Sequence, residues 1–179
     1  MWTRIAALLC VLAACSTPSK APPPAAPSPA VVAGTDIAWA QLTLALNERA
    51  FQILSLVPDR AADPRLVTLA AELTSSHTNE NVQLNALLRR IGAPVENPHT
   101  GHDMPGMATA GEVASMSAAR GVAFDQLFVE SLGKHLTQCE NLAQSMLQAG
   151  KLPDALALAA AIESARRQAL TRLAARGAP

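Results

Sequence analysis

The second half of this chain repeats the first half, at a constant offset of 89 positions and without a gap. The aligned pairs are Asp36 with Asp125, Trp39 with Phe128, Ala50 with Cys139, Pro64 with Pro153, LAAEL at 69–73 with LAAAI at 158–162, and Leu84 with Leu173. Apolar residues within the copies recur at spacings of four and three, which is the pattern of a helix with one buried face. Two copies of one helical hairpin predict an all-α fold, a four-helix bundle.

Local chemistry predicts where several helices begin. Thr35 is the expected N-cap of the first helix, and Asp63 before Pro64 has the form of an N-cap with proline at the first helical position. Thr109 and Glu112, three residues apart, predict a capping box at the start of a further short helix. The connections within each hairpin are short, so we expect the paired helices to run antiparallel.

The first 14 residues resemble a bacterial lipoprotein signal peptide. Arg4 supplies the positive charge, the run IAALLCVLA is too short to span a bilayer, and small residues lead into LAAC, which ends at Cys15. The resemblance implies cleavage before Cys15, lipid attachment to its thiol, and anchoring in the bilayer on the outer face of the cell membrane, or in the outer membrane or periplasm of a cell with two membranes. The alternative is an ordinary secretory signal cut elsewhere, and both interpretations predict export.

The chain after the signal peptide divides into a tether and a domain. Residues 15–34 hold the cysteine and a linker of proline, alanine and serine, which lacks the apolar side chains of a core. Residues 35–177 are the predicted bundle domain, with hairpins at about 35–92 and 120–176 and a loop at 93–109. A formal net charge of zero gives no reason to expect a nucleic-acid partner, and nothing in the sequence identifies a protein partner.

The loop contains HTGHDMPGM at 99–107, which holds two of the four histidines of the chain. His99, His102, Met104 and Met107 offer imidazole and thioether groups, a set that suits copper in both oxidation states. The alternative is that the proline and glycine of this stretch form a turn and the methionines pack over the bundle. The sequence therefore predicts either a copper site or a packed turn here.

Four parts of the chain together resemble the bacterial domain of unknown function family 305. They are HDMPGM at 102–107, FDQLF at 124–128, His135 and LAAAI at 158–162. The resemblance implies a ferritin-like four-helix bundle, commonly exported, with some members linked to copper binding or tolerance. Members usually carry a His-His pair on the first helix of each hairpin and Gln-x-x-Glu on the second. The matching positions here hold Leu46 and Asn47, His135 and Leu136, His77 and Glu80, and Arg166 and Ala169.

Four ionisable residues interrupt the apolar stripes of the predicted helices: His77, Glu80, His135 and Arg166. In one interpretation the two histidines and Glu80 meet as ligands of Cu(II), Zn(II) or Fe. In the other they form a hydrogen-bonded polar cluster, with Glu80 paired to a histidine or to Arg166. We favour the cluster, because the ligands that would complete a metal site are missing and Arg166 has no lone pair to offer. Cys139 is interpreted as inert packing, with a soft ligand near His135 as the alternative.

No enzyme motif stands out. A di-iron carboxylate oxidase needs Glu-x-x-His on two helices, and the one such spacing in this chain, Glu96 to His99, falls in the predicted loop. It also lacks a glycine-rich phosphate loop, a G-x-S-x-G elbow and a zincin motif. We therefore predict a non-enzyme: an envelope lipoprotein that binds copper through its loop, for buffering, tolerance or delivery. The alternative is a metal-free family member that acts as an adaptor or protein-interaction module.

Overall fold

The computed structural model describes residues 34–94 and 96–175. The expected signal peptide, Cys15, the linker up to residue 33 and the last residues of the predicted domain lie outside this range. The helices are α1 (Gly34–Leu54), α2 (Val57–Arg60), α3 (Pro64–Arg90), α4 (Ala110–Ala118), α5 (Gly121–Ala149) and α6 (Pro153–Ala175). The described part of the chain contains no strand, so the predicted all-α class is confirmed.

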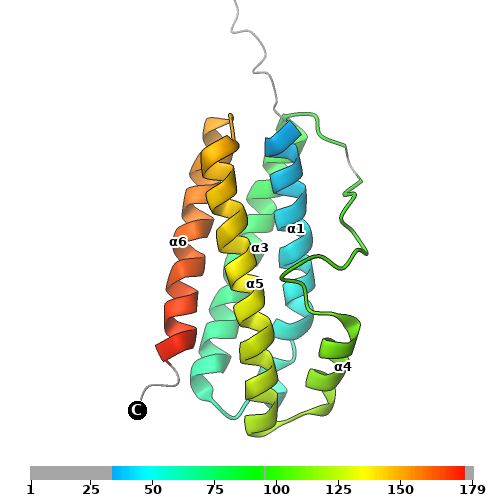
Figure 1. Ribbon diagram of the computed structural model, residues 1–179, viewed down its shortest axis with the longest axis vertical. Helices are drawn as coiled ribbons and strands as arrows, with labels where there is room; N and C mark the ends of the chain where they lie inside the picture. Colours follow the sequence, from blue (N-terminus) through cyan, green and yellow to red (C-terminus); the bar gives the residue numbers. More distant parts are fainter. Residues whose placement is uncertain (1–33, 95, 176–179) are drawn as a thin grey trace, which may run out of the picture. The chain divides into compact units, whose positions relative to one another are not determined.

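The four long helices α1, α3, α5 and α6 lie side by side and form the bundle (Figure 1). The short α4 lies beside α5, with which it makes contact, and follows the long connection from α3 (Figure 1). None of the helices in the described segments is long and apolar enough to cross a membrane.

Two of the predicted helix starts have the expected local geometry. Asp63 is the N-cap of α3, its side chain accepting a hydrogen bond from the amide two residues on at 2.9 Å, and Pro64 is the first helical residue. Thr109 and Glu112 form the capping box of α4. The glutamate accepts from the Thr109 amide at 2.8 Å, and the threonine hydroxyl accepts from the Glu112 amide at 3.2 Å. The sequence was sufficient to predict these two helix starts, because the residues that bond to each other in each cap lie within one helical turn.

The prediction for the start of α1 was wrong, because the helix already includes Gly34 and Thr35 is its second residue. The side chain that organises this end is Asp36, which binds another part of the bundle. Its carboxylate accepts from the amides of residues 151 and 152, at 3.1 and 2.9 Å. Asp125, its partner in the repeat, accepts from the amides of residues 62 and 63, both at 3.1 Å. The two carboxylates are 89 positions apart, and so are the two pairs of amides that they bind. The first helix of each hairpin therefore forms the same hydrogen bonds to the connection between the two helices of the other hairpin.

A polar layer crosses the bundle at mid-height and separates two apolar clusters. One cluster is built around Phe124 and Phe128, whose rings stack with centroids 5.7 Å apart, and the other around Trp39 and the start of α6. The residues of the polar layer lie between the two clusters on all four long helices: Asn47, His77, Glu80, His135 and Arg166. All five are buried, and the candidate interior site of the sequence lies in this layer.

Candidate functional site

The loop at 93–109 runs along α1 and is tied to it by side chains (Figure 1). Asn97 donates to the backbone carbonyl of Gln41 at 2.7 Å, and Arg49 forms an ion pair with Asp103 at 3.0 Å. The loop histidines therefore have a defined place against α1.

Gly106 holds the other end of the loop against α5. Its φ of +84° lies in the left-handed region, and a Cβ atom at this position would stand 2.4 Å from the Cβ of Gln138. Only glycine combines that conformation with so close an approach. The Gly106 backbone lies close enough to the ring of His135 to raise its pKa, against the larger lowering by burial, so the loop reaches the polar layer.

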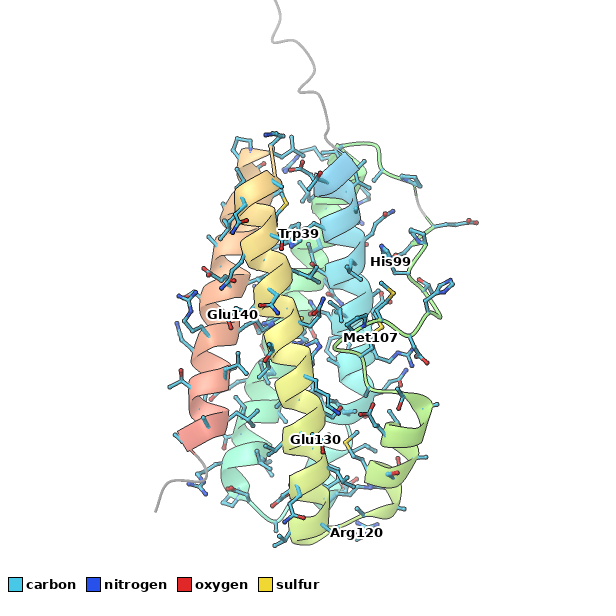
Figure 2. All side chains as sticks on the ribbon, in the orientation of Figure 1. Trp39, His99, Met107, Arg120, Glu130 and Glu140 are labelled. Carbon is cyan, nitrogen blue, oxygen red and sulfur yellow. The ribbon has the colours of Figure 1, made fainter. Side chains whose placement is uncertain are left out.

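A cavity of about 250 Å³ opens between the loop and α1. Its lining residues are Ala45, Glu48, Arg49 and Gln52 of α1 and His99, Thr100, Gly101, His102 and Met107 of the loop. Figure 2 labels His99 and Met107 on the loop beside α1. Three of the four predicted loop ligands share this cavity. The fourth, Met104, packs against the buried cluster that contains Met107.

The cavity could hold a metal only with a thioether among its ligands or with a movement of the loop. Within the segments that the structure describes, no three side chains of His, Cys, Asp or Glu lie close enough together to bind a metal ion. The donors that line the cavity are two imidazoles, the thioether of Met107 and the carboxylate of Glu48. Imidazole and thioether together suit copper and are too soft for calcium or magnesium.

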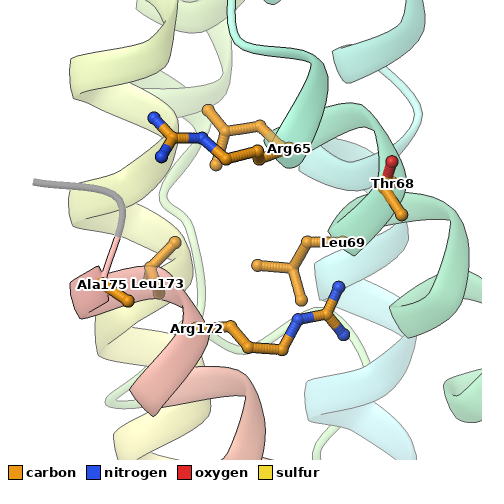
Figure 3. A pocket seen from close by; sticks show the side chains of 7 residues that line it. Arg65, Thr68, Leu69, Arg172, Leu173 and Ala175 are labelled. Carbon is orange, nitrogen blue, oxygen red and sulfur yellow. The ribbon is translucent and has the colours of Figure 1, made fainter.

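A second cavity, of about 300 Å³, lies between α3 and α6 (Figure 3). Leu69 and Leu173 line its apolar wall, and Arg65 and Arg172 stand at its rim. Arg172 forms an ion pair with Glu72. No imidazole, thiol or carboxylate lines this cavity, so it has none of the donors that mark the first one.

In the polar layer, Glu80 is paired with Arg166 and not with a histidine. Two hydrogen bonds join them, of 3.0 Å to Oε1 and 2.5 Å to Oε2. Ser76 donates to Oε1 at 2.8 Å and Asn47 donates to Oε2 at 3.0 Å. Each carboxylate oxygen of Glu80 thus accepts two hydrogen bonds, which is the arrangement that a buried charge requires.

His77 and His135 are bonded to each other across the bundle, with 2.9 Å between their Nε2 atoms. Burial, with a smaller contribution from the charge of Arg166, lowers the pKa of His77 to about 2. Burial, His77 and Arg166 also hold the pKa of His135 well below its ordinary value. Both rings are therefore neutral at physiological pH. Two nitrogens bound to one tetrahedral ion at ~2.0 Å are ~3.3 Å apart. The two Nε2 atoms are closer together than that, so they form a hydrogen bond and leave no room for a metal ion between them.

Cys139 lies next to the polar layer, and the sequence did not predict which side chains surround its thiol. Its Sγ lies 3.8 Å from Nδ1 and 3.7 Å from Nε2 of His135. It is buried in one cluster with Ala45, Leu46 and Met107, and burial raises the pKa of the thiol to about 11. The spacing of four residues from His135 was the only available signal, because it places the two side chains on one helix face.

The sequence model of the family described as Domain of unknown function (DUF305) matches residues 36–176. The chain belongs to this family. Its fold is similar to that of a candidate secreted DUF305 protein from Streptomyces coelicolor, with a TM-score of 0.70 and 20% identity over 78% of this chain and 88% of that one. It is also similar to a DUF305 fragment from Deinococcus radiodurans, with a TM-score of 0.69 and 22% identity over 80% of this chain and 95% of that one. No curated protein matches the chain.

The interior of this DUF305 protein differs from the ligand pattern that the resemblance implied. The positions at which that pattern places further ligands are buried, but they hold Leu46, Asn47, Leu136 and Ala169. Three of these side chains have no metal-binding atom, and Asn47 binds Glu80 and Asn81. The polar layer is therefore held together by hydrogen bonds among its own members.

Proposed function

We propose that this DUF305 protein is an exported, non-enzymatic copper-binding protein, which takes up the ion in the cavity between its loop and α1. The observation that supports this function is that His99, His102 and Met107 line one cavity although they are spread over nine residues of irregular chain. Such a protein would buffer copper in the cell envelope, confer tolerance to it or deliver it.

The chemistry of the cavity fits copper in both of its common oxidation states. The thioether favours Cu(I), and the imidazoles and the Glu48 carboxylate suit Cu(II). The nearest cation, Arg49, is neutralised by its ion pair with Asp103, which lowers its repulsion of an incoming ion. Of the side chains that line the cavity, only Ala45 and Met107 belong to a buried apolar cluster.

The test is titration of Cu(I) and Cu(II) into the wild type and the His99→Ala/His102→Ala variant. Loss of supporting contacts around a metal already weakens binding 10–100-fold, so loss of two ligands is expected to weaken it at least ~100-fold. The melting temperature of the metal-free protein should stay unchanged, because the loop lies outside the bundle core. Thr100→Ala is the matched control, since it alters the wall of the same cavity and removes no imidazole.

Copper affinity that survives the loss of both histidines would place the site elsewhere. An absence of copper binding in the wild type would leave the alternative function, a metal-free interaction module. That alternative is in keeping with the hydrogen-bonded polar layer, which needs no ion to satisfy Glu80.

We also propose that the lipid on Cys15 holds the protein to the membrane. The Cys15→Ser variant is expected to leave the membrane fraction and to lose acyl labelling, because the cysteine that ends the LAAC segment is the acceptor of the lipid. Cys10→Ala is the control, since it changes a cysteine of the signal peptide and keeps the LAAC segment intact. If the serine variant still sediments with membranes, a partner or a second anchor holds the protein.

A further inference from the structure

The two histidines of the cavity lie in parts of the loop that are held in different ways. His99 belongs to a turn over residues 97–100, which the Thr100 amide closes by donating to the Asn97 carbonyl at 3.1 Å. Pro98 stands at the second position of this turn, where its ring fixes φ. The side-chain oxygen of Asn97 also accepts a hydrogen bond from the His99 amide at 3.0 Å. The backbone that carries the His99 ring is therefore held by both the backbone and the side chain of Asn97.

Asn97 also fastens this turn to the bundle. Its side-chain nitrogen donates to the backbone carbonyl of Gln41 at 2.7 Å, and Gln41 is a buried residue of α1. Both hydrogen bonds of the Asn97 side chain are partly buried, and His99 is half-buried. One amide group thus joins a long helix to the backbone of a candidate copper ligand.

His102 is exposed and is held by weaker contacts. Its amide donates to the His99 carbonyl at 3.3 Å, and it follows Gly101, whose φ of +80° lies in the left-handed region. Arg49 of α1 donates to the His102 carbonyl at 3.4 Å, which is long for a hydrogen bond. The ion pair of Arg49 with Asp103 adds little, because the Asp103 side chain is 64% exposed. His102 is therefore the less firmly held of the two histidines.

We propose that Asn97 is the positioning residue of the copper cavity, holding His99 as a fixed ligand while His102 moves onto the bound ion. This inference rests on the proposed function. A movement on the exposed His102 side of the loop leaves both hydrogen bonds of the Asn97 side chain intact. A ligand whose backbone is already ordered loses less conformational freedom on binding, so Asn97 raises the affinity by fixing His99 before the ion arrives.

A double-mutant cycle on the full chain tests the role of Asn97. Asn97→Ala is expected to weaken the binding of Cu(I) and Cu(II) ~10–100-fold, as the loss of a supporting contact does at other metal sites. The melting temperature of the metal-free protein should not change, because Asn97 lies outside the apolar clusters. The loss should persist in the His102→Ala background and shrink to less than ~2-fold in the His99→Ala background, since Asn97 acts through His99. An equal loss in both backgrounds would overturn the inference, because Asn97 would then support the loop in general.

Arg49→Ala is the matched control, because it removes another side-chain tie between α1 and the loop. Since this tie is exposed, we expect its loss to weaken copper binding by no more than ~5-fold. A loss as large as that of Asn97→Ala would overturn the assignment of His99 as the fixed ligand.

Amide 15N relaxation of the metal-free protein provides a measurement that needs no copper. In the wild type we expect an order parameter of ~0.85 at His99 and a lower value at His102, and Asn97→Ala should lower the value at His99. An unchanged value at His99 would overturn the role of Asn97. No copper binding by the wild type would overturn the proposed function and this inference with it, whereas binding that is insensitive to Asn97→Ala would overturn the inference alone.

Discussion

Lowering the pH from about 7 to about 4.5 is expected to reduce the free energy of unfolding by at least about 2.5 kcal/mol, the contribution of His77 alone. The cause is the neutral pair of His77 and His135, whose pKa values burial holds far below those of exposed rings. Below pH ~6.5 these two histidines bind protons in the unfolded chain but remain neutral in the folded chain. Each ring therefore lowers the free energy of unfolding by ~1.4 kcal/mol per pH unit until its folded pKa is reached. For His77 this loss continues until its folded pKa, about 2, is reached.

Urea unfolding followed by circular dichroism at a series of pH values measures this slope. His135→Leu is the matched variant, because Leu46 occupies the equivalent position of the repeat. Its slope below pH 6.5 should be smaller, since one of the two rings that stay unprotonated in the fold has been removed. Carboxylates with lowered pKa values add their own losses at more acidic pH, so the comparison stops at about 4.5. The same slope in both proteins would mean that His135 titrates normally in the fold.

Replacing Glu80 with alanine is expected to destabilise the bundle by about 3–5 kcal/mol. The substitution leaves the guanidinium of Arg166, which is fully buried, without its carboxylate partner. Replacing Glu80 and Arg166 together with methionine should recover most of the loss, because buried ion pairs often exchange for apolar residues at little net cost. The free energy of unfolding from urea titration measures all three proteins.

The exposed pair of Glu72 and Arg172 provides the control within the same two helices. It also joins α3 to α6, but both side chains are about half exposed. Glu72→Ala is therefore expected to change stability by no more than about 1 kcal/mol. A similar loss for Glu72→Ala and Glu80→Ala would show that burial does not set the value of the inner pair.

The fold could be predicted largely from the chain alone, because its signals act over one or two helical turns. The spacing of apolar residues determined which face of each helix is buried, and the gapless repeat determined that two equal hairpins are present. The Asp63–Pro64 cap and the Thr109–Glu112 box place both partners within three residues of each other, so no knowledge of neighbouring helices was needed. Thr35 failed as a cap because the helix already includes Gly34, and the neighbouring carboxylate, Asp36, binds a distant connection.

The candidate sites depended on which side chains the packing brings together. Helical periodicity placed His77, Glu80, His135 and Arg166 inside, but it did not determine their pairing. The rotation and register of the helices decided that Glu80 meets Arg166 and that the two histidines meet each other. Likewise, the close approach of Gly106 to Gln138 decides where the loop lies. That approach places His99 and His102 over α1, and Met107 over Cys139. Local spacing thus determined the elements, whereas close packing between distant segments, which no short-range pattern encodes, decided the chemistry of their contacts.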